Sequence, residues 1–313
     1  MTLPFEQQFE IPGMTKLDGI DVQTATPTEH IIENIKKNKN SARIYNTIDK
    51  LPSWREQRPI AIVGGGPSLT KELDNLRNYE CILACGSVHD YLLENNITPN
   101  WCAVCDPDPI VSNYLKHKKN CVESKPIQYL VASQCAPEVF NHLIDCDVHM
   151  WHLMGDKFDH SVYGDNQVLI GGGCTILTRA MVIAMGMGFY NLNLFGCDTS
   201  LGLNSEHHAY EWSDPSKEIT HDEAKVQFER DGPIFKVAGY HLGQLFDIKA
   251  LSKQYQNRMQ ITVHGESLLH YFMELAQKRL KLKKEWDLKN GVNSGLNGSG
   301  PASVSSSENS PQP

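Results

Sequence analysis

The sequence predicts an α/β fold of the doubly wound type, with a mostly parallel sheet and a helical appendage at the N-terminus. Short apolar runs alternate with helix-compatible polar segments from about residue 59 onward. Each run is continuously apolar, as is typical of parallel strands that are covered on both faces. Two runs end in three consecutive glycines that lead into a helical segment. These observations together favour alternating strands and helices over an all-helical or all-strand protein.

The elements follow in order along the chain. Residues 1–57 form the appendage, a polar and partly helical segment in which Ile31, Ile32 and Ile35 have helical spacing. Strands are expected at residues 60–65, 81–86, 101–106, 127–133, 148–154, 191–198 and 260–265. Helices are expected at residues 69–78, 88–96, 174–188, 242–256 and 267–286. Residues 58–287 are therefore one domain, and residues 288–313, which have almost no apolar side chains, are expected to be a disordered tail.

Charge and composition disfavour several classes of protein. The 313 residues include 29 Lys and Arg against 37 Asp and Glu, a formal net charge of −8. This balance disfavours nucleic acid as a partner, although it leaves a local basic groove open. No apolar run reaches the roughly 20 residues of a membrane-spanning helix, and the N-terminal stretch lacks a secretory pattern. The nine cysteines suit free thiols in a reducing compartment, so we expect a cytoplasmic protein.

The first glycine turn, "VGGGPSL", has the chemistry of an anion-binding site. Gly64, Gly65 and Gly66 allow backbone N–H groups to approach an anion, and the next helix directs its positive end to the same point. Pro67 suits the first turn of that helix, and Ser68 offers a hydroxyl or a helix cap. The spacing matches neither the dinucleotide fingerprint nor the P-loop. The alternative is a tight turn that only joins strand to helix.

A second turn repeats this arrangement. Gly172 and Gly173 follow an apolar run, and Thr175 opens a helix that is apolar nearly all round and is therefore expected to be buried. Open α/β sheets bind ligands at the carboxyl edge of their strands. The two turns therefore predict one ligand that spans this edge.

Acidic residues end two further strands. Asp106 and Asp108 lie in "CDPDP", and Asp198 lies in "LFGCDTS". Carboxylates at strand ends can hold Mg²⁺ or orient ribose hydroxyls. Asp-Pro and Asp-Thr pairs also occur in purely structural turns, which is the alternative for each position.

These motifs resemble a known family. "VGGGPSL", "CDPDP", the block from residue 171 to 198 and the segment "DIKALSKQYQNRMQITVHGESLLHYFMEL" are similar to archaeal 6-hydroxymethylpterin diphosphokinase MptE-like domains and to motility accessory factor glycosyltransferases. The same signatures are similar to family 42 bacterial sialyltransferases. The resemblance covers roughly residues 58–280. It implies a Rossmann-like domain that binds a nucleotide-activated donor and transfers a group from it.

The resemblance also implies roles for individual residues. Gly64, Gly66, Pro67 and Ser68 would hold the donor phosphate. The sialyltransferases use a histidine as general base and tyrosines that steady the leaving phosphate. The corresponding candidates here are His241, Tyr240 and Tyr210, with His208 of "SEHHAYEW" as a further candidate.

Three functions fit these observations. The first is a glycosyltransferase that uses a nucleotide sugar as donor and a glycan, a protein or another small molecule as acceptor, with Mg²⁺ optional. The second is a Mg²⁺-dependent diphosphokinase that uses ATP, with metal on Asp106, Asp108 and Asp198. The third is a nucleotide-binding module without catalysis. No lysine follows the first turn at P-loop spacing, which favours the glycosyltransferase. The oligomeric state stays open.

Overall fold

The computed structural model of the chain describes residues 26–41, 46–47, 58–120, 122–155, 159–165, 167–202, 204–210, 224–227, 232–255 and 258–290. The chain divides into two compact units, residues 1–271 and residues 272–313. The expected tail lies outside the described residues from residue 291 onward. Most of the expected appendage, residues 1–57, also lies outside them. No helix in the described ranges combines the length and the apolar character that crossing a membrane requires.

A parallel sheet in the first unit confirms the predicted fold class. Its strand order is β1-β6-β5-β4-β3-β2-β8-β11, with β7 paired to β6. Every strand pair in this sheet is parallel. The predicted strands are present as β2 (Pro59–Val63), β3 (Ile82–Cys85), β4 (Trp101–Val104), β5 (Gln128–Ala132), β6 (Asp147–Leu153), β8 (Asn191–Phe195) and β11 (Gln260–His264). The short strands β1 (Asn46–Thr47) and β7 (Leu169–Ile170) join them.

Helices cover both faces of the sheet because the chain reverses direction. It runs from β2 through β3, β4 and β5 to β6, and then returns across the sheet to β8 and β11 on the other side of β2. Right-handed crossovers place the helices of these two halves on opposite faces. The first half contains α3 (Leu69–Leu76), α4 (Val88–Glu94) and α5 (Pro137–His142), and the second contains α6 (Ile176–Gly186) and α7 (Gly239–Gln254). The reversal leaves a crevice at the carboxyl ends of β2 and β8.

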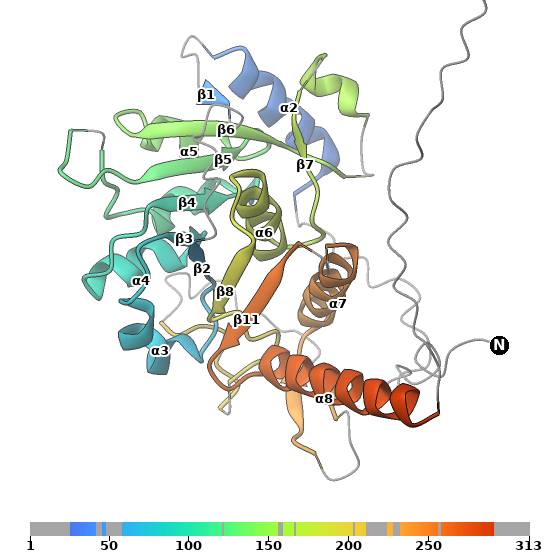
Figure 1. The fold of residues 1–313 in the computed structure, drawn as a ribbon. Helices are drawn as coiled ribbons and strands as arrows, with labels where there is room; N and C mark the ends of the chain where they lie inside the picture. Colours follow the sequence, from blue (N-terminus) through green and yellow to red (C-terminus); the bar gives the residue numbers. More distant parts are fainter. Residues whose placement is uncertain are drawn as a thin grey trace, which may run out of the picture. The chain divides into compact units, whose positions relative to one another are not determined.

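Helix α6 is buried, as its apolar sequence predicts. It lies across the sheet in Figure 1 and packs against β2, β3 and β4. The remaining described elements are the short helices η2 (Pro109–Tyr114) and η3 (His160–Tyr163), the antiparallel pair β9 (Ala224–Val226) and β10 (Phe235–Val237), and α8 (Leu268–Lys289).

Helix α2 (Thr28–Lys39) of the N-terminal segment is attached to the edge of the sheet that binds ligands in this fold class. The buried Asn38 amide donates to the carbonyl groups of Ser133 at 2.9 Å and Cys135 at 2.7 Å, just after β5. Ile31 of the same helix lines the cavity described below. The appendage therefore contributes a wall of the site, which the sequence did not predict.

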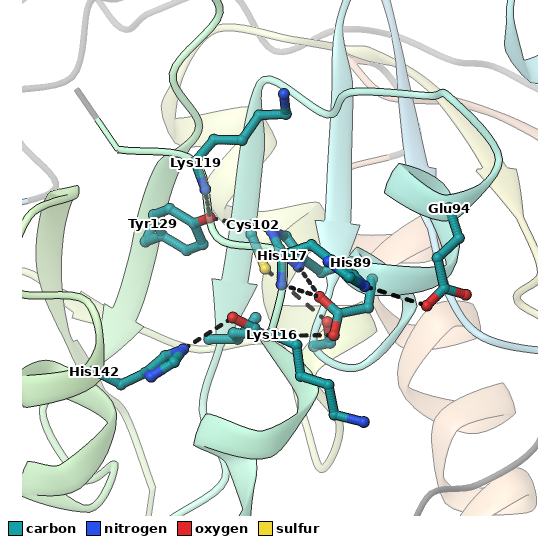
Figure 2. A network of polar contacts seen from close by, with 11 residues as sticks. His89, Glu94, Cys102, Lys116, His117, Lys119, Tyr129 and His142 are labelled. Carbon is teal, nitrogen blue, oxygen red and sulfur yellow. Dashed lines mark hydrogen bonds and ion pairs between the residues drawn. The ribbon is translucent and has the colours of Figure 1, made fainter. Parts of the chain in front are cut away.

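A buried polar network fixes the segment that follows η2 (Figure 2). The Tyr129 hydroxyl accepts the N–H of Lys119 at 3.0 Å and lies 3.1 Å from His89 Nε2. His89 Nδ1 lies 2.8 Å from Asp90 Oδ1, and Asp90 Oδ2 accepts the N–H of Lys116 at 2.9 Å. Tyr129 and His89 are both fully buried. These bonds therefore replace the water that the same groups would bind in the unfolded chain.

Tyr129→Phe should lower the free energy of unfolding by about 1–3 kcal/mol, because it removes the hydroxyl that pairs with one buried and one half-buried group. The affected groups are His89 Nε2 and the N–H of Lys119. Urea unfolding measures the loss. Tyr190→Phe, at an exposed position before β8, is the matched control and should have no effect. Equal stability of the two variants would contradict a structural role for the network.

Candidate active site

A cavity of about 1040 Å³ opens at the carboxyl edge of the sheet, over the crevice between β2 and β8. Its volume is at the upper end of the range of about 300–1000 Å³ for small-molecule sites. It lies where the sequence predicts the ligand. The predicted residues that line it are Gly64, Gly65, Gly66, Asp106, Gly172, Gly173, Thr175, Asp198, His208, Tyr240 and His241. Those outside its wall are Pro67, Ser68, Asp108 and Tyr210.

The first glycine turn is bonded to β8 and to the loop that follows it. The N–H groups of Gly64 and Gly66 donate to carbonyl groups at the end of β8, each at 2.8 Å. The N–H of Ser68 donates to Asp198 Oδ2, also at 2.8 Å. The sequence pattern predicts N–H groups that point at a ligand, but these three have partners within the protein. A phosphate contact of this turn stays a prediction.

Close approach of β8 explains why two of these positions are glycine. A Cβ on Gly64 would lie 2.5 Å from the carbonyl oxygen of Gly196. A Cβ on Gly66 would lie 2.7 Å from the carboxyl carbon of Asp198. The absence of a side chain lets the backbone meet another part of the chain. The anion that the turn holds in this structure is thus the side chain of Asp198.

Asp198 is a buried carboxylate bound by neutral groups. Its Oδ1 accepts the hydroxyl of Ser68, and its Oδ2 accepts the N–H of the same residue. Burial raises the pKa of Asp198 from 3.8 to about 6, and the bonds from Ser68 offset part of that rise. Among the described residues, no Lys or Arg forms an ion pair with this carboxylate. Its ionised form is therefore poorly compensated.

The backbone around Asp198 is unusual. Gly196 has a φ of +57° and Thr199 has a φ of +53°. The left-handed region is disfavoured for a β-branched residue, and such strain costs about 1–3 kcal/mol. Thr199 is also buried and lines the cavity. Strain of this kind is concentrated at functional sites, which supports a role for this loop.

Imidazole and phenol groups at the start of α7 also line the cavity. His241 is buried, and its Nδ1 accepts the N–H of Ala238 at 3.0 Å. A neutral His241 ring therefore carries its proton on Nε2, which makes that atom a donor. The hydroxyl of Tyr240 lies 3.1 Å from His207 Nδ1, and burial raises the pKa of Tyr240 to about 12. The general-base role expected of His241 would require an unprotonated Nε2, so this geometry favours a donor role instead.

The segment 204–210 is attached to the first glycine turn. The N–H of Ala209 donates to the carbonyl of Gly65 at 2.9 Å. The hydroxyl of Tyr210 lies 2.6 Å from Ser87 Oγ and also 2.6 Å from where a Cβ on Gly65 would be. Burial raises the pKa of Tyr210, and burial lowers the pKa of His208 to about 4. Tyr210 thus packs against the turn, while His208 is a neutral ring at physiological pH.

The second glycine turn also meets a carboxylate of the chain. The N–H of Cys174 donates to Asp247 Oδ2 of α7 at 2.8 Å. Gly173 has a φ of +99°, and a Cβ there would collide with the Asp247 carboxyl group. This turn therefore ties α7 to the start of α6. Sequence reasoning missed Asp247, because the motif does not show which distant side chain will reach it.

Arg179 is a second residue that sequence reasoning missed. It follows the α6 cap Thr175, whose Oγ1 lies 3.5 Å from the N–H of Thr178. Its Nη1 donates to the carbonyl groups of Ile170 at 2.7 Å and Met154 at 3.3 Å. The side chain is buried, lines the cavity, and has a pKa lowered by that burial. The signal in the sequence was a single arginine within an apolar helix, since arginine is rarely buried without partners.

The two acidic residues of "CDPDP" have different positions. Asp108 Oδ1 accepts the N–H of Ile110 at 2.9 Å and caps η2. Asp106 lines the cavity, and its Oδ1 accepts the N–H of Asp108 at 2.9 Å. Within the described ranges, no three His, Cys, Asp or Glu side chains gather as a metal site. Asp106 is therefore the carboxylate of this pair that faces the cavity.

Comparison with known families agrees with these observations. A family model described as "6-hydroxymethylpterin diphosphokinase MptE-like" matches residues 29–202, which is more than half of the chain. The chain belongs to this MptE-like family. The resemblance noted in the sequence is thereby confirmed, and the match includes all but the first residue of helix α2 and both glycine turns of this MptE-like protein. No curated protein matches the chain in sequence.

A solved structure of low sequence identity shares the fold of this MptE-like protein. The MAf glycosyltransferase from Magnetospirillum magneticum AMB-1 has a TM-score of 0.56 and 16% sequence identity, over 76% of this chain and 36% of that chain. The chain thus spans little more than a third of that enzyme's length. A mammalian sialyltransferase has a TM-score of 0.37 and 9% identity, over 77% of this chain and 87% of the other. The first of these likenesses supports the Rossmann-like fold.

Proposed function

We propose that this chain is a nucleotide-binding transferase, and specifically a glycosyltransferase that moves a sugar from a nucleotide-activated donor to an acceptor hydroxyl. The observation that carries the proposal is the cavity at the crevice between β2 and β8, because nucleotides bind at this point in doubly wound sheets. The volume of about 1040 Å³ has room for a donor together with part of an acceptor. The donor base, the sugar and the acceptor (a glycan, a protein or another small molecule) are left to experiment.

The cavity contains donors suited to a departing phosphate. In sugar transfer the bond between the sugar carbon and the phosphate oxygen breaks, and the electron pair goes to that oxygen. Nε2–H of His241 is one donor for the resulting charge, because Nδ1 is occupied by the N–H of Ala238. The hydroxyl of Tyr240, whose pKa is raised to about 12, stays protonated and is a second donor. Fixed donors in a site shielded from water stabilise such charge strongly.

His241→Ala should lower the turnover of a nucleotide sugar by roughly 10²–10³-fold, because one fixed donor to the leaving phosphate is lost. Binding of the donor should be weakened much less, since the charge develops mainly in the transition state. Release of free nucleotide measures the rate, and calorimetric titration measures binding. His117→Ala, at a half-exposed position beside Glu94, is the control and should keep the wild-type rate. An unchanged rate in His241→Ala would remove this residue from the mechanism.

The second candidate is a diphosphokinase that transfers pyrophosphate from ATP. The description of the family and the position of Asp106 in the cavity wall favour it. Mg²⁺ binds through one or two carboxylates together with substrate phosphates, and Asp106 is the residue that would hold it here. The metal would neutralise phosphate charge. Loss of all turnover with a chelator and with Asp106→Asn, while His241→Ala stays active, would favour this candidate.

A thermal-shift screen tests nucleotide binding directly. The panel contains CMP, UDP, GDP and ATP and the corresponding nucleotide sugars, each with and without Mg²⁺. A ligand that binds only the folded state raises the free energy of unfolding by mass action, by about 2.7 kcal/mol at a ligand concentration of 100 times its Kd. The melting temperature rises accordingly. We expect a nucleotide sugar to give the largest shift without any need for Mg²⁺. Binding without turnover of any donor would indicate a non-catalytic module.

A further inference from the structure

We propose that Asp198 is the general base of the transfer and accepts the proton of the acceptor hydroxyl. The inference rests on the proposed glycosyl transfer, and it gives the reaction a proton acceptor that the geometry of His241 does not supply. Asp198 lines the cavity at the crevice between β2 and β8, where the fold directs its ligand.

Two hydrogen bonds hold the carboxylate in one orientation. Ser68 donates its N–H to Oδ2 and its hydroxyl to Oδ1. A carboxylate has about four lone-pair sites, so each oxygen keeps capacity for one more donor. Gly66 has no side chain that could displace the group, and Thr199 is held in a left-handed conformation beside it. The carboxylate is therefore pre-positioned and still able to accept a proton.

The histidines and the arginine in the cavity wall fit the role of base less well than Asp198. His241 Nδ1 is occupied by the N–H of Ala238, and His207 Nδ1 lies 3.1 Å from the Tyr240 hydroxyl. Burial lowers the pKa of His208 to about 4, which makes it a weaker base than Asp198. Arg179 keeps its proton.

The immediate surroundings of Asp198 contain few other charges. Ser68, the residue directly before α3, faces the carboxylate with its polar side chain. In the first turn of α8, the N–H of Leu269 donates to the Asp198 carbonyl, and Gly265, which precedes this helix, lies against Ser68. The titratable groups of the cavity wall near the start of α7 are the rings of Tyr240 and His241. The raised pKa of Asp198 is therefore due mainly to its burial.

A purely structural role would not require a carboxylate here. An asparagine could accept the N–H of Ser68 with its amide oxygen and donate its amide N–H to the hydroxyl oxygen. The ionised aspartate destabilises the folded state, because no cation among the described residues pairs with it. The pKa of about 6, by contrast, suits a base that works near neutral pH. An ionisable group that lies in a cleft and lowers the stability of the folded state indicates a functional site.

The proposed step transfers one proton to Asp198 and one electron pair to the leaving phosphate. The acceptor O–H bond breaks, and its proton passes to a carboxylate oxygen of Asp198. The acceptor oxygen forms a bond to the sugar carbon while the bond from that carbon to the phosphate oxygen breaks. The electron pair of that bond leaves with the nucleotide phosphate, which accepts a hydrogen bond from His241. Asp198 then returns its proton to solvent.

The test compares the wild type with Asp198→Asn and with Asp74→Asn. Asp74 is exposed on α3, so its variant controls for the effect of an Asp-to-Asn substitution itself. The probes are CMP-, UDP- and GDP-sugars. Release of nucleotide is followed with water as acceptor over about pH 5 to 9, and donor binding by calorimetric titration. We expect Asp198→Asn to fold and to bind the donor as the wild type does. Its kcat should fall by roughly 10²–10⁴-fold. The activity of the wild type should decrease as the pH falls through about 6, whereas the activity of the variant should not show this decrease.

The outcomes separate this inference from the proposed function. Suppose that the wild type cleaves a nucleotide sugar and that Asp198→Asn cleaves it at the same rate, with the same decrease in activity at low pH. Asp198 is then not the base, although the proposed function stands. Loss of donor binding in Asp198→Asn, with the melting temperature retained, would make Asp198 a binding residue and would also overturn the inference. If the wild type neither binds nor cleaves any sugar nucleotide, the proposed function fails and the inference fails with it.

Discussion

Asp198→Asn should be more stable than the wild type above about pH 6, by up to about 3 kcal/mol, although it loses activity. The folded-state pKa of Asp198 is raised from 3.8 to about 6 by burial. Between these values the folded wild type binds more protons than the unfolded chain, so its stability falls as the pH rises through this window. Asparagine does not ionise, so the variant avoids this loss. The difference should be small near about pH 4 and complete above about pH 7.

Urea unfolding of both proteins across this range measures the effect. Burial lowers the pKa of His208 and of His152 to about 4, so these rings favour the folded state increasingly as the pH rises. Their contribution has the opposite sign to that of Asp198, but it is present in both proteins and cancels in the difference. A difference that does not change between about pH 4 and 7 would mean that Asp198 has an ordinary pKa.

Gly64→Ala should lower the free energy of unfolding by about 3 kcal/mol, because the new methyl group has no room. Its Cβ would lie 2.5 Å from the carbonyl oxygen of Gly196, and both residues lie at the ends of paired parallel strands. Backbone atoms in the centre of a sheet move aside less readily than the atoms of a side chain would. Urea unfolding at neutral pH measures the loss.

Gly186→Ala is the matched control for Gly64→Ala. Gly186 is the last residue of α6, and a Cβ there would meet no atom within 4 Å. Alanine should leave stability unchanged or raise it by up to about 1 kcal/mol, since it favours the helix over the unfolded chain. Equal losses in the two variants would show that the steric argument for Gly64 is wrong.

The fold could be predicted because its signals are local. A strand covered on both faces is mostly apolar, and the central strands β2, β3 and β4 carry that signal within four or five residues each. Helix α5 was missed because it has six residues and begins at Pro137, which leaves too few positions for a period to appear. Strand β1, with two residues, was missed for the same reason.

The location of the cavity could be predicted, whereas the contacts around it could not. Glycine turns and strand-end carboxylates mark the carboxyl edge, and the cavity lies there. A glycine shows that something comes close to the backbone, but not whether it is a ligand or another part of the chain. Ser68 and Asp198 are 130 positions apart in the sequence, and the turn motif does not encode their pairing. The same limit applies to Cys174 and Asp247, which are 73 positions apart.

The orientation of a ring is likewise invisible in sequence. His241 could be named as a candidate from its position before an apolar helix. Its proposed role depends on which nitrogen is occupied, and in the structure Nδ1 accepts the N–H of Ala238, three residues earlier. The proposed exchange of roles, with Asp198 as base and His241 as donor, follows from such contacts.

Identification of the nucleotide products distinguishes glycosyl transfer from pyrophosphoryl transfer. The purified protein is incubated in parallel with CMP-, UDP- and GDP-sugars, and with ATP, Mg²⁺ and a 6-hydroxymethylpterin, and the products are identified by mass spectrometry. We expect a nucleotide sugar to be cleaved to its free nucleotide, also in the presence of a chelator, while ATP stays intact. Formation of AMP and a pterin diphosphate from ATP, with every nucleotide sugar left intact, would contradict this expectation.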